Sequence, residues 1–304
     1  MKNRLFIYVS MVVMTVLGIT LISSCTKDPV FEQGDYLYQY EDFKKVDYVN
    51  GIVINWSDNM EITEEQKSVI KNLFANLVYV KGGTFLMGAQ HTNPNDIQYD
   101  AGAQDNESPV HEVSLSDYYI GKFEITQREW RAVMGYDLNW SEVYGKGDRI
   151  PAYNVTRSNA IDFLNKLSQM TRLSFQLPTE AQWEFAARGG NSTQQFRYSG
   201  GNDVNAVAWH KNNAGHKLHN VGEKQANELG LHDMSGSLWE WCRDRYNTYP
   251  SESQQNPCNI LGNTWVLRGG SWTYLPSFCR VTCRDTYTDD RSVANGFRVV
   301  LPIQ

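Results

Sequence analysis

Residues 177–190 read Leu177-Pro178-Thr179-Glu180-Ala181-Gln182-Trp183-Glu184-Phe185-Ala186-Ala187-Arg188-Gly189-Gly190. The stretch Thr179-Glu180-Ala181-Gln182 has the spacing of a capping box, in which the threonine and glutamine side chains each accept from the other's backbone N–H. Gly189 follows the last residue that favours a helix, and glycine commonly ends helices because it adopts a left-handed conformation without steric cost. The segment therefore predicts a short helix with sharp ends.

The same signal occurs twice upstream of this segment. Capping boxes at 63–66 and 126–129 predict a helix from about 64 to 76 and a second helix that ends at Gly135. A further helix is expected from Ser158, with one apolar face formed by Ala160, Ile161, Leu164 and Leu167.

Strand patterns fill much of the remaining chain. Apolar or alternating stretches at 77–80, 84–88, 111–115 and 118–123 predict strands. From residue 190 onward the sequence favours short strands and long loops rich in Gly and Asn, with no internal repeat. The expected fold class is α+β with much irregular structure.

Six segments appear in a fixed order: Val80-Lys81-Gly82-Gly83-Thr84-Phe85-Leu86-Met87-Gly88, Glu124-Ile125-Thr126 leading to Trp130, the stretch 177–190, Gly230-Leu231-His232-Asp233-Met234-Ser235-Gly236-Ser237-Leu238-Trp239-Glu240-Trp241, Arg268-Gly269-Gly270-Ser271-Trp272 and Asn295-Gly296-Phe297-Arg298. Together they resemble the formylglycine-generating enzyme family, also called the sulfatase-modifying factor family. The resemblance implies a domain related to the C-type lectin fold, often with bound calcium.

Enzymes of that family use copper and oxygen to oxidise a cysteine of a sulfatase peptide to formylglycine, and two cysteines hold the copper. By resemblance Cys279 matches the second of these cysteines and Ser271 matches a family serine, so both are candidate catalytic residues. Tyr274 stands in place of the first cysteine, Leu275 replaces a histidine, and Phe278 replaces a tyrosine. Copper(I) prefers soft thiolates, which a phenol cannot replace. Copper is therefore not expected here.

The resemblance also implies a structural calcium site. It assigns side-chain ligands to Asp233 and Glu240 and backbone carbonyl ligands to Gly236 and Leu238. Oxygen ligands and a flexible backbone suit calcium. The alternative is that Asp233 stabilises a turn and Glu240 pairs with a nearby arginine. Arg268 and Arg298 are both expected to form ion pairs with Glu240, Asp285 or other acids.

Four cysteines follow Cys25, namely Cys242, Cys258, Cys279 and Cys283, and they allow three complete pairings. A disulfide between Cys242 and Cys279, buried free thiols, and a rebuilt metal site are all open alternatives. Three histidines at 210, 216 and 219 fit no zinc spacing and are expected to be solvated loop residues.

The N-terminus has the features of an export signal. Lys2 and Arg4 precede an apolar stretch from 5 to 22, and Ser23-Ser24-Cys25 resembles a bacterial lipobox in which Cys25 is lipidated. The alternative is a transmembrane helix, for which this stretch is at the short limit. The expected organisation is a signal peptide at 1–24, a tether and lead-in at 25–62, and the folded domain at 63–304. The expected location is the cell envelope, with the lipid anchor in the outer membrane.

Charge and composition restrict the partners. The formal charge is −6 and no basic stripe occurs, so nucleic acid is not expected to bind. The sequence favours a lipid-anchored, non-catalytic protein that binds a protein or glycan partner and touches the membrane only through its anchor. The alternative is a formylglycine-generating oxidase that matures exported sulfatases.

Overall fold

The structure is a computed structural model that describes residues 46–303. The expected signal peptide, Cys25 and the first part of the expected tether lie outside the described residues. Within residues 46–303, no helix is both long enough and apolar enough to cross a bilayer.

Four helices begin at threonine caps. They are α3 (Glu64–Ala75), α4 (Gln127–Met134), α5 (Arg157–Thr171) and α6 (Glu180–Ala187), with capping boxes at Thr63, Thr126, Thr156 and Thr179. The boxes predicted at residues 63, 126 and 179 are confirmed, as is the left-handed Gly135 at the end of α4. The predicted start of α5 at Ser158 is late by one residue. Its cap, Thr156, pairs with Asn159 rather than with the usual Glu or Gln.

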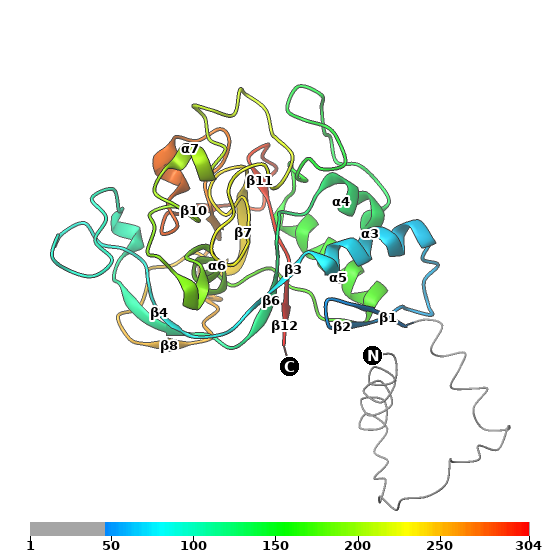
Figure 1. Ribbon diagram of the computed structural model, residues 1–304, viewed down its shortest axis with the longest axis horizontal. Helices are drawn as coiled ribbons and strands as arrows, with labels where there is room; N and C mark the ends of the chain where they lie inside the picture. Colours follow the sequence, from blue (N-terminus) through cyan, green and yellow to red (C-terminus); the bar gives the residue numbers. More distant parts are fainter. Residues whose placement is uncertain (1–45, 304) are drawn as a thin grey trace, which may run out of the picture. The chain divides into compact units, whose positions relative to one another are not determined.

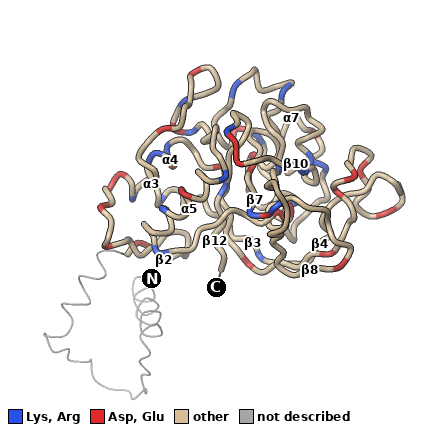
Figure 2. Tube along the Cα trace, turned by 180° about the vertical axis from the view of Figure 1, so that it is seen from behind, with Lys and Arg blue, Asp and Glu red and all other residues tan. Residues whose placement is uncertain are grey.

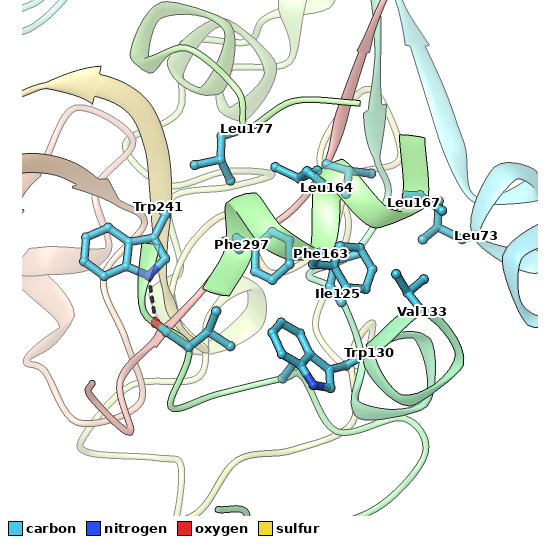
Figure 3. Close-up of a cluster of buried hydrophobic side chains, with 14 of the residues drawn as sticks. Leu73, Ile125, Trp130, Val133, Phe163, Leu164, Leu167, Leu177, Trp241 and Phe297 are labelled. Atoms are coloured by element: carbon cyan, nitrogen blue, oxygen red, sulfur yellow. Dashed lines mark hydrogen bonds between the residues drawn. The ribbon is translucent and has the colours of Figure 1, made fainter. Parts of the chain in front are cut away.

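The first core cluster lies where α3, α4 and α5 pack side by side (Figure 1). Trp130 from α4 stacks on Phe163 from α5 with ring centroids 5.7 Å apart, and Phe297 meets Phe163 edge-on at 5.4 Å (Figure 3). Phe163 is fully buried, whereas Ile161, which was expected on the apolar face of α5, is only partly buried.

Two three-stranded sheets separate strands that are neighbours in the sequence. One sheet has the order β12 (Val300–Pro302), β6 (Tyr118–Gly121), β3 (Leu77–Val80). The other has the order β4 (Thr84–Met87), β5 (His111–Ser114), β8 (Gln254–Gln255). The predicted strands at 77–80 and 84–88 therefore form, but they pair with different partners rather than with each other.

A four-stranded sheet carries most of the segments that follow residue 230. Its order is β10 (Arg284–Tyr287), β9 (Trp265–Arg268), β7 (Trp239–Arg245), β11 (Asn295–Gly296). Trp239 and Trp241 of β7 are both buried, as the alternation along a strand predicted. The indole N–H of Trp241 donates to Val155 O at 2.9 Å. The short elements η2 (Asp105–Glu107), η3 (Gly190–Ser192), α7 (Val204–Val207) and η4 (Pro276–Cys279) complete the described chain.

The fold begins earlier than residue 63. β1 (Val46–Val49) and β2 (Ile52–Asn55) form an antiparallel hairpin, and Ile52, Ile54 and Trp56 lie in the first core cluster. Residues 46–62 are thus part of the packed domain rather than a tether. The hairpin was missed because the apolar run Ile52-Val53-Ile54 in β2 is only three residues long and has no clear period, which is too short a pattern to distinguish from a linker.

Candidate functional site

The Gly-Gly-Ser segment after β9 lies directly against the end of η4. Gly270 has a φ of +76°, and a Cβ there would stand 2.7 Å from Phe278 O. Only glycine permits both this backbone conformation and this close approach. The fold therefore brings the two candidate catalytic residues, Ser271 and Cys279, into one neighbourhood.

Both of these side chains are buried. Cys279 has no exposed surface and packs with Tyr198, Val207 and Ala208. Burial raises the pKa of the Cys279 thiol to about 12, so it remains protonated at neutral pH. Ser271 is also fully buried, and its Oγ hydrogen-bonds with Thr273 Oγ1 at 3.0 Å.

Aromatic packing occupies the position of the missing first cysteine. The Tyr274 ring meets Trp239 edge-on at 5.5 Å and Phe278 at 5.4 Å. Burial raises the pKa of the Tyr274 phenol, so it does not become an anionic ligand at neutral pH. One protonated, buried thiol and one neutral phenol do not fit a copper(I) site.

The four cysteines that follow Cys25 are free thiols. Cys242 on β7 packs in the second core cluster with Val266 and Val281, whereas Cys279 packs in a different cluster. The Cys242–Cys279 disulfide, one of the open alternatives, is not formed, since the two residues pack in different clusters. Free thiols were the alternative, and Cys242, Cys279 and Cys283 are buried while Cys258 is half-buried.

The positions aligned with calcium lie in a buried acidic cluster. Both carboxylate oxygens of Glu240 accept from Arg298 at 2.7 Å, and Oε2 also accepts from Trp183 Nε1. Asp233 Oδ2 accepts from Gly222 N at 2.7 Å. Arg298 is thus the arginine partner that the sequence suggested for Glu240.

Sequence reasoning missed the third acid of this cluster. Glu124 accepts from Leu238 N at 2.9 Å and from Ser237 Oγ at 3.0 Å, in the same loop that carries Asp233. Burial, followed by the charges of Asp233 and Glu240, raises the pKa of Glu124 well above its usual range. Its place in the Glu124-Ile125-Thr126 segment was the available signal, but its contacts are all distant in sequence.

The donor arrangement decides whether calcium fits. Arg298 already engages both oxygens of Glu240, and within residues 46–303 no three or more His, Cys, Asp or Glu side chains are arranged to hold a metal ion. As arranged, Asp233, Gly236, Leu238 and Glu240 do not fit a calcium cage of six to eight oxygens. The calcium site that the resemblance implied is to be tested by measuring the Tm with calcium and with a chelator.

A second buried ion network explains why residues 177–190 are so distinctive. Glu180 and Glu184 lie one turn apart on α6, and the guanidinium of Arg268 bonds both, at 2.9 and 2.6 Å. Arg284 pairs with Glu180 and Arg188 with Glu184. Arg268 was expected to pair with Glu240, Asp285 or another acid, and its partners are Glu180 and Glu184.

A cleft of about 360 Å³ opens beside this network. Glu180, Asp244 and Arg284 contribute to its wall, and Ile260 and Leu261 stand at its rim with 80% and 67% of their surface exposed. Ser271, Tyr274 and Cys279 do not line this cleft. This cleft is thus separate from the positions that resemble a catalytic centre.

The loop histidines differ from expectation at one position. His210 is buried, and its ring bonds Asn205 Oδ1 at 3.1 Å and Asn212 N at 3.2 Å. His219 stacks on Trp209 at 3.7 Å, whereas His216 is exposed. Hydrogen bonds within the loop therefore account for His210, which is not solvated as expected.

The model of the sulfatase-modifying factor enzyme 1-like domain matches residues 63–303. The chain belongs to this family. The chain is 33% identical over 211 residues to "Chaperone protein LppX" of Paenibacillus barcinonensis, and the match covers 53% of this chain and 71% of the relative. It is 28% identical over 287 residues to "Formylglycine-generating enzyme" of Thermomonospora curvata, and this match covers 73% of this chain and 92% of the relative.

A solved structure with a similar fold supports the fold described above. Treponema denticola variable protein 1 superposes with a TM-score of 0.64 at 27% identity, covering 84% of this chain and 98% of that one. The fold expected from the sequence is confirmed as a mixed helix and sheet fold of this family.

Proposed function

We propose that this protein is an exported, lipid-anchored member of the family that binds a partner without catalysing cysteine oxidation. The observation that carries the proposal is the pair formed by Tyr274 and Cys279. Tyr274 is packed between aromatic rings where a first thiolate would stand. Cys279 is buried with a pKa of about 12. Oxidative chemistry requires a reachable thiolate, because the thiolate is the metal ligand and the nucleophile.

The relatives support an assembly role with a protein partner over a glycan partner. A relative that this chain covers to 71% carries the name of a chaperone. Loops on a fixed scaffold suit recognition, and the described chain offers many of them between short strands. Cys25 would hold the domain at the outer membrane of the cell envelope.

An oxidation assay tests the proposal. The full chain in detergent is incubated with copper(I), a reductant, oxygen and a sulfatase-type cysteine peptide, and the peptide mass is followed. The formylglycine-generating enzyme of Thermomonospora curvata, run in parallel, shows that the peptide and copper are competent. We expect the peptide mass to stay unchanged and no copper to co-elute with the chain, and formation of formylglycine would overturn the proposal.

The alternative function is the oxidase itself, maturing exported sulfatases. It is favoured by the long match to a relative named formylglycine-generating enzyme and by Ser271 and Cys279. A variant distinguishes the two. Tyr274→Cys combined with Leu275→His restores the family pattern, and we expect it to remain inactive because Cys279 still lies in an apolar pocket. Activity of this double variant, with none in the natural chain, would indicate that the residues at positions 274 and 275 were the obstacle.

The anchor is tested separately. Cells expressing the chain are labelled with a fatty-acid analogue, and Cys25→Ala serves as the matched control. We expect label and membrane association in the natural chain and neither in the variant. Equal membrane association of both would favour the transmembrane alternative.

A further inference from the structure

Two arginines stack on Trp265 of β9, and a third arginine, Arg243, lies next to them with its guanidinium donating to Gln176 Oε1 at 2.7 Å. The Cζ atoms of Arg157 and Arg245 lie 3.3 and 3.4 Å from the centroid of the Trp265 ring. Two guanidinium groups cannot share one face of a ring at this distance, so they cover opposite faces. Arg157 also donates to Arg243 O at 3.1 Å, which places the backbone of Arg243 beside the pair.

These arginines have no carboxylate partner. Within residues 46–303, the buried Arg268, Arg280, Arg284 and Arg298 each pair with a glutamate, whereas Arg157, Arg243 and Arg245 form no ion pair. Asp289, whose charge acts on Arg157, accepts a hydrogen bond from Ser158 N at 2.9 Å and forms no ion pair with these arginines. Burial, followed by the charge of Arg245, lowers the pKa of Arg157 to about 10.

The positive charge is therefore local. The whole chain is acidic at −6, and Figure 2 shows Lys and Arg positions interspersed with Asp and Glu over most of the trace. Arg157, Arg243 and Arg245 thus bring three positive charges without an ion-pair partner to this part of the domain. Such charge complements an anionic partner.

Apolar side chains border the arginines. Ile260 and Leu261 are 80% and 67% exposed, and with Arg245 they line the cleft of about 360 Å³. Tyr287 is opposite Trp265 in the β9–β10 pairing, and Trp265 is opposite Arg245 in the β7–β9 pairing. We call these residues the Arg–Trp surface: Arg157, Arg243, Arg245, Ile260, Leu261, Trp265 and Tyr287.

We propose that the Arg–Trp surface docks an acidic protein segment whose Asp or Glu side chains alternate with aliphatic ones. Guanidinium groups bind carboxylates through paired N–H donors, and exposed Ile260 and Leu261 offer the aliphatic side chains an apolar contact. Trp, Tyr and Arg are the residues that most often dominate binding energy at protein interfaces. A sugar ring cannot stack on Trp265, because guanidinium groups cover both of its faces. This inference rests on the proposed binding role.

A binding experiment with matched variants tests the surface. A labelled synthetic peptide of alternating Glu and Leu is titrated with the full chain in detergent, and fluorescence anisotropy gives the Kd. We expect binding that weakens at higher salt, since screening reduces charge attraction. Arg243→Glu combined with Arg245→Gln is expected to weaken it at least about tenfold, because each guanidinium–carboxylate contact at an interface contributes this order.

The control is Arg128→Glu on α4. Arg128 is exposed and forms no ion pair within residues 46–303, so this variant changes charge without touching the surface. Ile260→Ser with Leu261→Ser provides a second arm in which no charge changes, and it should also weaken binding. Circular dichroism melts show that every variant is folded.

Absence of peptide binding to the natural chain would overturn the inference. A loss of affinity in Arg128→Glu equal to that in the Arg243/Arg245 variant would also overturn it. Binding of an oligogalacturonate as tight as or tighter than that of the peptide would assign the surface to an acidic glycan instead. None of these depends on copper or formylglycine. Failure of the surface is therefore distinguishable from failure of the non-catalytic role, which the oxidation assay decides.

Discussion

Arg298 links several distant segments at the centre of the domain through its hydrogen bonds. It is fully buried, pairs with Glu240 through two bonds, and donates to Gly121 O at 2.9 Å and His232 O at 3.0 Å. Its guanidinium is the cation shared by the carboxyl groups of Glu124, Asp233 and Glu240.

We expect Arg298→Met to lower the free energy of unfolding by about 3–5 kcal/mol, because it leaves a buried carboxylate without its partner. Urea unfolding measures the change. Arg172→Gln is the matched control, since Arg172 forms an exposed pair with Asp58, and such pairs contribute about 1 kcal/mol or less. Equal effects of the two substitutions would contradict the prediction.

Two buried aspartates predict the pH dependence of stability. Burial, followed by the charge of Glu180, raises the pKa of Asp244 to about 7, and burial raises the pKa of Asp233 to about 6. Between about pH 4 and pH 7 the unfolded chain loses these protons while the folded chain keeps them. The two groups therefore lower the free energy of unfolding as pH rises through that window.

We expect Asp244→Asn to flatten part of this slope. Asp244 accepts hydrogen bonds from the backbone N–H groups of Glu180 and Asn259. The substitution loses one of these two hydrogen bonds, but this loss does not vary with pH. Urea unfolding at several pH values between 4 and 8 compares the two slopes. An unchanged slope in the variant would show that Asp244 does not titrate in this range.

At the scale of elements, the hairpin of β1 and β2 is the part of the fold that the sequence did not predict. Ile54 on β2 has no exposed surface and packs in the same cluster as Phe74 and Leu73 of α3. We expect Ile54→Ala to destabilise the domain by about 2–5 kcal/mol, as for other buried aliphatic truncations. Thermal or urea unfolding provides the measurement.

The exposed neighbour on the same strand supplies the control. Val53 is 39% exposed, so Val53→Ala should change the free energy of unfolding by about 0.5 kcal/mol or less. A small effect of Ile54→Ala would mean that residues 46–56 are a dispensable lead-in and that the domain begins at residue 63.

Helices were the most predictable elements because their signals are local. A capping box spans four consecutive residues, and Thr63, Thr126 and Thr179 each form theirs as predicted. Strand pairing was not predictable in the same way. β7 and β11 pair in parallel although residues 246–294 lie between them, and such long-range partners depend on packing rather than on neighbouring residues.

At the scale of the whole molecule, calcium would act by stabilising the loops around Asp233 and Glu240. An ion that binds only the folded chain raises its stability by an amount set by concentration and Kd. Because Arg298 already engages Glu240, we expect the Tm to be the same in excess calcium and in chelator. A clear rise in Tm with calcium would show that the cluster rearranges to bind the ion.

The sequence by itself determined the family, the starts of the helices and the replacement of the first copper-binding cysteine by Tyr274, because each of these depends on residues that are close together along the chain. Only the tertiary structure decided that Cys279 is sealed in an apolar pocket, that Glu124 joins Asp233 and Glu240, and that Arg157 and Arg245 enclose Trp265. The physical reason is that burial and charge pairing depend on residues brought together from distant segments. A thiol's pKa or an arginine's missing partner is a property of those surroundings and not of the local sequence.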